Sequence, residues 1–304
     1  MKKSTKIMGI IIGSLLVSGL ILCTIGSLFG GLTQAKAMAR ENNGTLGFNH
    51  FGIHMNMDMK NKDGNTGDIY EKSFDIKQLD ELDMEVGAGT VEIKLSEDGS
   101  CYATYSSEER TKFEIKGNKL SVNIKEKRGI FGDTVNDEEY VCIYLPSANV
   151  ADVDIKLGAG TLEAMTDLIT DELKVNIGAG EAVFDEVDSK KADVKIGAGT
   201  CSFDKMVTGE VDFDVAMGEC VVKHITAEKA DVKVGMGSAD ITYDCEKEEL
   251  SYSANCGMGE IVIGGDQVLA GIGGSESQKS EDGEKKQKLD VDCGMGSVNV
   301  GFSK

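Results

Sequence analysis

A Gly-x-Gly motif recurs eight times along the 304-residue chain, and five consecutive copies begin 19 or 20 residues apart. The copies begin at Gly87, Gly158, Gly178, Gly197, Ala216, Gly235, Gly257 and Gly294, with alanine in place of the first glycine once. A fixed period of this length is typical of a solenoid, in which each repeat is one coil that buries its apolar face only against its neighbours. The repeat therefore predicts an all-β protein, a parallel β-solenoid with coils of 19 or 20 residues.

Apolar and polar residues alternate around every copy. Before the fourth copy the apolar positions are Ala192, Val194 and Ile196, and the positions between them are charged. Beyond the glycines the apolar positions shift by one residue, to Cys201 and Phe203. Alternation with a period of two predicts a strand with one buried face. The shift in phase predicts a corner between two strands, and glycine tolerates the backbone dihedral angles that a corner needs.

We therefore interpret the motif glycines as structural corners. They are Gly87, Gly89, Gly158, Gly160, Gly178, Gly180, Gly197, Gly199, Gly218, Gly235, Gly237, Gly257, Gly259, Gly294 and Gly296. The residue between them is alanine in the first four copies and methionine in the last four. Stacked coils place equivalent residues in columns about 4.8 Å apart. A methionine column suits a soft metal ion or a partner surface, although a flexible filler of the core or the corner is the interpretation we favour.

Two pairs of cysteines occupy equivalent positions in different copies. Cys201 and Cys220 both follow the motif by the same distance, and Cys256 and Cys293 both precede it directly. Residues on neighbouring coils just satisfy the Cα separation of a disulfide, so stacked disulfides are one interpretation. Apolar filling of the core is the interpretation we favour. No Cys-x-x-Cys pattern occurs, and a zinc site therefore has little support.

The N-terminus predicts attachment to a membrane. Residues 7–32 form an almost uncharged apolar run, which is long enough to cross a bilayer with some tilt. Three lysines within residues 1–6 favour a cytoplasmic N-terminus and an extracytoplasmic remainder. The chain is thus expected to be a single-pass protein of the cell membrane. A cleaved signal peptide is the alternative, because residues 35–37 and 37–39 have the small-x-small form of a cleavage site.

The rest of the chain divides into segments that differ in composition and in the regularity of the repeat. Residues 33–68 are polar and are interpreted as a stalk, followed by the solenoid over residues 69–304. Within the solenoid, residues 96–150 are irregular and include a hairpin pattern over residues 113–124. We expect this region to cap one end of the stack, because exposed strand edges invite aggregation. Residues 264–288 are rich in charge and glycine and predict a loop inserted between coils.

The sequence offers little support for catalysis. No copy of the motif continues into a dinucleotide or phosphate-binding fingerprint, and no triad pattern occurs. We therefore predict no enzyme activity, no cofactor and no metal centre. The net charge of -20 disfavours nucleic acid as a partner. A polysaccharide-active β-helix is the enzyme alternative, with an outward column of carboxylates formed by Asp154, Asp193, Asp212, Asp231 and Asp290. Such an acidic face could also bind Ca²⁺ or Mg²⁺ weakly, or dock on a basic partner.

Two sequence features carry a family resemblance. The strands end in Gly-Ala-Gly-Thr or Gly-Met-Gly-Ser, and the tripeptide Tyr-Leu-Pro at residues 144–146 precedes the regular repeats. Together with the short N-terminal anchor, they resemble the bacterial putative-adhesin family of domains of unknown function over about residues 74–302. The resemblance implies a β-solenoid surface domain without established enzymatic activity, sometimes associated with envelope-stress systems. It supplies no binding residues. We expect a non-catalytic interaction module whose partner is a cell-envelope or surface protein or glycan. The alternative is an accessory role in an envelope-stress response.

Overall fold

The structure, a computed structural model, describes residues 46–48, 53–55, 69–125, 139–270, 274–278 and 287–303. The chain folds as two compact units, Met1–Gly67 and Asp68–Lys304. In the first unit, β1 (Leu46–Phe48) and β2 (Ile53–Met55) pair in antiparallel fashion. The cytoplasmic segment and the membrane anchor predicted for residues 1–32 lie outside the described residues. Within the described part of the chain, no helix combines the length and apolar character needed to span a bilayer.

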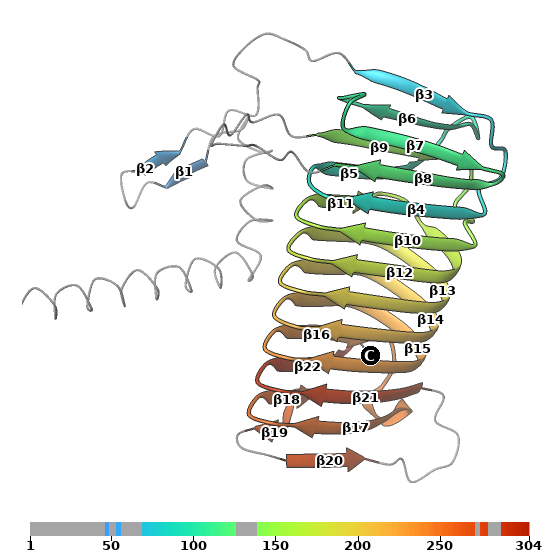
Figure 1. The fold of residues 1–304 in the computed structure, drawn as a ribbon. Helices are drawn as coiled ribbons and strands as arrows, with labels where there is room; N and C mark the ends of the chain where they lie inside the picture. The colour runs from blue at the N-terminus through green and yellow to red at the C-terminus, as the bar shows by residue number, and fades with distance from the viewer. Residues whose placement is uncertain are drawn as a thin grey trace, which may run out of the picture. The chain divides into compact units, whose positions relative to one another are not determined.

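The second unit is a stack of parallel β-coils (Figure 1). Its central strands are β12 (Leu168–Ile177), β13 (Glu181–Ile196), β14 (Thr200–Val215) and β15 (Glu219–Val234). Each pairs with the next in parallel register, and the ladder between β13 and β14 is interrupted only at Asp185 and Lys190. The strands bend at these interruptions and so follow the coil around its core. The prediction of an all-β fold with parallel, stacked repeats is confirmed for this unit.

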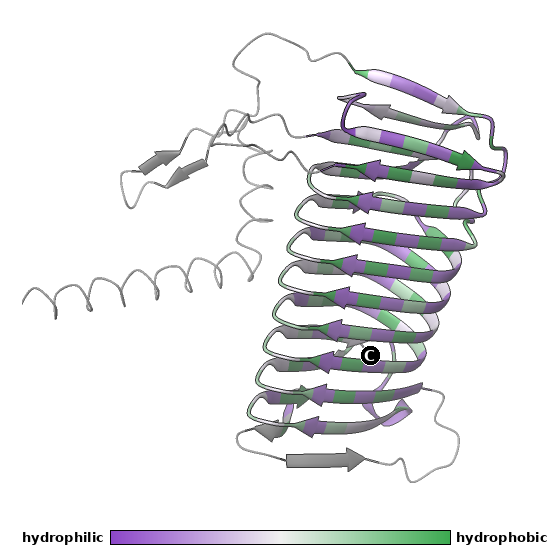
Figure 2. Ribbon diagram, in the orientation of Figure 1, coloured by the Kyte–Doolittle hydropathy of each residue, from purple (hydrophilic) through white to green (hydrophobic). Residues whose placement is uncertain are grey.

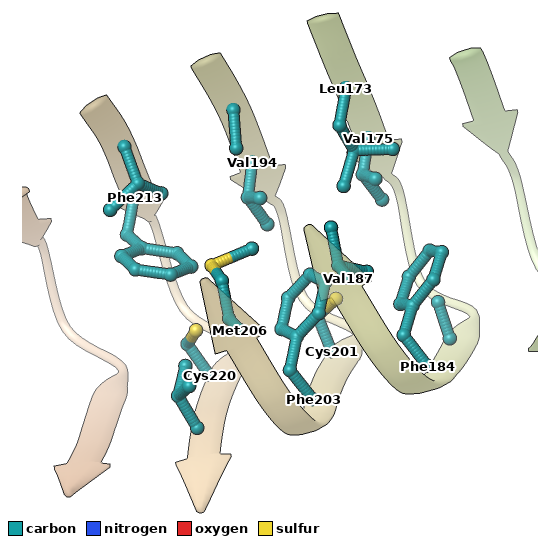
Figure 3. Packing of buried hydrophobic residues seen from close by; sticks show 14 of the residues in the cluster. Leu173, Val175, Phe184, Val187, Val194, Cys201, Phe203, Met206, Phe213 and Cys220 are labelled. Carbon is teal, nitrogen blue, oxygen red and sulfur yellow. The ribbon is translucent and has the colours of Figure 1, made fainter. Parts of the chain in front are cut away.

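The core lies inside the coils, and its residues are those that the alternation indicates. Ala192, Val194 and Ile196 are buried on β13, while the charged residues between them face outward. Figure 2 shows the same alternation of hydrophobic and hydrophilic positions along each rung. Across the corner the buried set changes phase, as predicted, to include Phe203 on β14. Phe203 stacks on Phe184 of the preceding coil with ring centroids 4.8 Å apart (Figure 3).

The first Gly-x-Gly coil is not the outermost rung of the stack. The strands at this end are β4 (Glu81–Val86), β5 (Thr90–Leu95), β8 (Lys119–Ile124), β9 (Tyr140–Leu145), β10 (Asp152–Leu157) and β11 (Thr161–Ala164). The coil β4–β5 pairs with β10 and β11 on one side. On its other side, β8 and β9 form a further parallel rung. The chain therefore returns beyond its own first coil before it begins the regular array.

Antiparallel strands cover this end of the stack. They are β3 (Tyr70–Phe74), β6 (Cys101–Tyr105) and β7 (Thr111–Lys116). The hairpin predicted over residues 113–124 is confirmed as β7–β8, with Gly117 at the turn in the left-handed region (φ 63°). Strand β6 pairs antiparallel with both β3 and β9. Pairing of this kind satisfies backbone groups that a bare parallel edge would leave open.

The other end differs from the expected order of coils. Its elements are β16 (Ser238–Tyr243), the 3₁₀ turn η2 (Lys247–Glu249), β17 (Leu250–Cys256), β18 (Glu260–Ile263), β19 (Asp266–Ala270), β20 (Gly274–Gln278), β21 (Gln287–Cys293) and β22 (Ser297–Phe302). Strand β21 lies between β15 and β17, and β22 lies between β16 and β18. The last copy of the motif in the sequence is thus the penultimate rung of the stack.

The segment predicted as a charged loop, residues 264–288, contains two strands. β19 pairs antiparallel with β18, and β20 pairs antiparallel with β17, so that both close the end of the stack. The sequence of β20, Gly-Ser-Glu-Ser-Gln, has no apolar residue. Hydrophobic alternation therefore gives no signal for this strand, and backbone pairing with β17 decides its structure instead.

Candidate interaction surfaces

The corner glycines stack directly on one another. The N–H of Gly197 donates to Ile177 O and that of Thr200 to Gly180 O, at 2.7 and 2.9 Å. Among the described corner glycines only Gly89 has a φ in the left-handed region, at 138°. The expectation that unusual dihedral angles require glycine at every corner is therefore wrong. The cause is the close approach of the neighbouring rung, whose backbone leaves little room for a Cβ atom.

The two glycines of a motif differ in how close that approach is. A Cβ atom at the first glycine would lie 2.6–2.9 Å from a carbonyl oxygen of the adjacent rung. These glycines are Gly158, Gly178, Gly197, Gly235, Gly257 and Gly294. At the second glycine of each motif after the first, the distance is only 2.1–2.5 Å. These are Gly160, Gly180, Gly199, Gly218, Gly237, Gly259 and Gly296. This difference explains why the one natural alanine, Ala216, occupies the first position.

The outward side chains of the rungs form an acidic row. Asp193, Asp212, Asp231 and Asp290 occupy equivalent positions on β13, β14, β15 and β21 and are paired in register. We call these four residues the aspartate row. Asp154, which the sequence placed in the same column, is separated from the row by Lys174 of β12. Register thus brings four of the five predicted carboxylates together and leaves the fifth apart.

Lysines on the same strands pair with two carboxylates of the aspartate row. Lys195 Nζ lies 2.8 Å from Asp193, and Lys229 Nζ lies 2.6 Å from Asp231. Partial burial and the neighbouring Asp231 carboxyl raise the pKa of Asp212. In the described part of the chain, no group of three or more His, Cys, Asp or Glu side chains is arranged to hold a metal ion. Weak binding of Ca²⁺ or Mg²⁺ by this face stays a prediction, as does the absence of catalysis.

A shallow hollow of about 280 Å³ lies farther along the same face. Its charged lining residues are Glu81, Asp83, Lys119, Asp152, Asp154, Glu172 and Lys174. Lys119 Nζ lies 3.4 Å from both Glu81 and Asp83 and bridges two rungs. Charged groups that pair across rungs in this way suit contact with another charged surface better than enclosure of a small molecule.

The predicted cysteine pairs are neighbours in the stack. Cys201 is in register with Cys220 on adjacent strands, and Cys256 is in register with Cys293. All seven described cysteines are buried and carry free thiols. The structure therefore agrees with cysteines that fill the core, and disulfide formation between the paired positions stays a prediction. Burial raises the pKa of both Cys201 and Cys220, and it raises the pKa of Cys101 to about 11.

These raised pKa values predict a loss of stability in alkali. The unfolded chain releases its thiol protons near pH 9, the ordinary value, whereas the folded chain keeps those of Cys101, Cys201 and Cys220. Because the folded state then binds more protons, the free energy of unfolding falls as pH rises above 9. Denaturant midpoints from pH 8 to 10.5 should show this decline, and a Cys201→Ala/Cys220→Ala variant should show a shallower one. An equal slope in both proteins would contradict the prediction.

The middle residues of the last four motifs form an exposed edge. In stack order they are Met217, Met236, Met295 and Met258, and we call them the methionine row. Their exposed fractions are 58, 56, 54 and 61%. The interpretation of these methionines as fillers of the core or the corner is wrong for the core, because the corner turns more than half of each side chain into solvent. By contrast, Met84 and Met206 are completely buried.

Residues 79–291 match the family model described as Toastrack DUF4097. The match covers more than half of the chain, and the protein therefore belongs to this family, a domain of unknown function. No curated protein matches the chain.

Several solved structures are similar to this chain. A putative adhesin from Bacteroides fragilis is 14% identical with a TM-score of 0.50, and the alignment covers 77% of this chain and 97% of that one. A putative adhesin from Parabacteroides merdae is 14% identical with a TM-score of 0.45, covering 79 and 98% of the two chains. A putative lipid binding protein from Parabacteroides distasonis is 17% identical with a TM-score of 0.44, covering 77 and 97%. At 14% identity, the likeness to the Bacteroides fragilis protein shows the fold alone.

Proposed function

We propose that this protein is a non-catalytic interaction module of the cell surface. Its coils would present the aspartate row to cationic groups of a cell-envelope or surface protein or glycan. The likeness to proteins described as putative adhesins agrees with this proposal. Residues 7–32 would hold the module at the membrane, with the solenoid on the extracytoplasmic side.

The observation that carries the proposal is the aspartate row itself. Four carboxylates project from four consecutive rungs in strict register, so that their spacing follows the strand separation of about 4.8 Å. A partner with regularly spaced cationic groups could contact several of them at once. Each exposed contact contributes little by itself, about 0–1 kcal/mol. Repetition of the contact along the stack would raise the total affinity.

Charge reversal on the aspartate row tests the proposal. The full-length chain would be mixed with isolated cell envelopes, and an Asp212→Lys/Asp290→Lys variant should bind at least about tenfold more weakly. Binding of the native chain should also weaken as salt increases, because salt screens exposed charges. Glu163→Lys on β11, across the glycine corner from the row, is the matched control and should bind normally. Equal binding by all three proteins would overturn the proposal.

The membrane anchor has a separate test. After cell fractionation, the full-length chain should remain with the membranes and resist extraction by high salt, because the apolar segment 7–32 is held by the hydrophobic effect. Protease added outside intact cells should digest the solenoid. Release of a shortened chain into the medium would favour the signal-peptide alternative. Co-purification with membrane signalling proteins, without binding to envelopes, would favour the regulatory role.

A further inference from the structure

The methionine row is continuous in space. The N–H groups of Met236, Met295 and Met258 each donate to the carbonyl oxygen of the residue that precedes the methionine of the adjacent rung, at 2.7 Å. This bonding sets the four corners one above another at the strand separation of about 4.8 Å. It also fixes their spatial order, in which β21–β22 stands between the rungs of Met236 and Met258. Four thioethers thus share one edge without interruption.

Packing does not account for methionine at these positions. The equivalent residues of other rungs, such as Ala179 and Ala198, are alanines that turn on the same edge. The corner therefore needs no side chain beyond a methyl group. More than half of each methionine of the row is exposed, so these side chains gain little from burial. We therefore relate the methionines at these positions to the chemical groups that this edge exposes to solvent.

We propose that the methionine row binds Cu(I) through its thioether sulfurs. Thioethers are soft, neutral ligands that select Cu(I) over hard cations such as Ca²⁺ and Mg²⁺. Methionine has three rotatable side-chain bonds, and neighbouring rungs are close enough for two or three sulfurs to converge on one ion. The four equivalent positions offer several overlapping combinations of ligands along the edge.

The charges beside the row favour a cation. Two residues beyond the methionine, the first of these rungs carries Glu219 and the outermost rung carries Glu260. Three residues before the methionine the chain carries Asp214 and Asp292 in two rungs, against Lys233 in a third. All five residues lie at outward positions of their strands. Four carboxylates against one ammonium group give the edge a negative field, which attracts a monovalent cation.

The test uses the full-length chain in detergent with its methionine methyl groups labelled with ¹³C. Ag(I), a soft monovalent ion that is stable to air, serves as the first probe. Methyl resonances of the methionine row should shift on addition of Ag(I), while those of the buried Met84 and Met206 should not. Anaerobic competition against a chromogenic Cu(I) chelator then measures affinity. Replacing all four methionines of the row with leucine should weaken Cu(I) binding at least about tenfold.

Two controls separate the row from other soft ligands. Met165→Leu changes an exposed methionine away from the row and should leave Cu(I) affinity unchanged. Cys256→Ser/Cys293→Ser removes the nearest register pair of thiols and should also leave it unchanged. If the cysteine variant loses the affinity and the leucine variant keeps it, the proposal is overturned. The proposal is also overturned if addition of Ag(I) does not shift the four methyl resonances of the methionine row. It is likewise overturned if replacing the row with leucine alters binding to envelopes but not Cu(I) affinity.

Discussion

Replacing Gly237 by alanine is expected to lower the free energy of unfolding by about 3 kcal/mol, the upper end of the usual range for overpacking. A Cβ atom there would lie 2.1 Å from Gly218 O and 3.0 Å from two further backbone atoms. Because every one of these neighbours is main chain of the adjacent rung, no side chain can move aside to relieve the clash. The rungs themselves must separate and lengthen the hydrogen bonds between them. Denaturant midpoints measured by circular dichroism would give the change.

Gly235→Ala in the same motif is the matched control. Its Cβ atom would lie 2.7 Å from Ala216 O, and Ala216 itself shows that the position accepts a methyl group. The expected loss is about 1 kcal/mol or less, because alanine also lowers the entropy of the unfolded chain. Equal losses in the two variants would show that the contact distance does not decide the role of these glycines.

The strands and the core could be predicted because both follow from local pattern. Period-two alternation assigns each side chain to one face of a strand, and a slip by one residue would expose the whole apolar set. Val194 and Phe203 are buried on the two sides of a corner, as that pattern requires. The repeat length then fixes which residues of neighbouring coils meet. The pairing of Cys201 with Cys220 is a direct consequence of this length.

The order of the last two rungs could not be predicted in the same way. The motifs at Gly257 and Gly294 follow similar strands, and either could pair with the coil that ends at Gly235 while burying the same face. After Tyr243, the connection through η2 instead leads to β17 and β18, which lie one rung farther out. The rung between is formed later by β21 and β22. Hydrophobic pattern carries no information about such a skip.

The surfaces were harder to predict for a geometric reason. Methionine sits where the inward positions change from one phase to the other, so alternation does not say whether Met236 or its neighbours face solvent. The sequence of one coil likewise does not give the distance between rungs. Ala216 alone indicates that the first glycine of a motif can be replaced. The aspartate row needed register as well, because Lys174 interrupts the column between Asp154 and Asp193.

The second large effect is expected from Phe203→Ala, which should lower the free energy of unfolding by about 3–5 kcal/mol. The Phe203 side chain is fully buried. Its ring stacks on Phe184 and meets Phe213 edge to face, with centroids 4.8 and 6.4 Å apart (Figure 3). Removal leaves a cavity between two rings that the strand ladders hold in place. Phe302→Ala is the comparison, because Phe302 is only partly buried. It should lower the free energy of unfolding by only about 1 kcal/mol.

The position of Phe203 adds a prediction about where stability is lost. In a solenoid each coil contacts only its neighbours, and stability is close to a sum of coil and interface contributions. The cavity of Phe203→Ala therefore weakens the interfaces of β13, β14 and β15 directly, while the rungs of β4 and β8 keep all their contacts. Amide hydrogen exchange should accelerate first in the three central strands and least in β4 and β8. Equal acceleration along the whole stack would mean that the coils unfold as one cooperative unit, and the nearest-neighbour description would then fail for this protein.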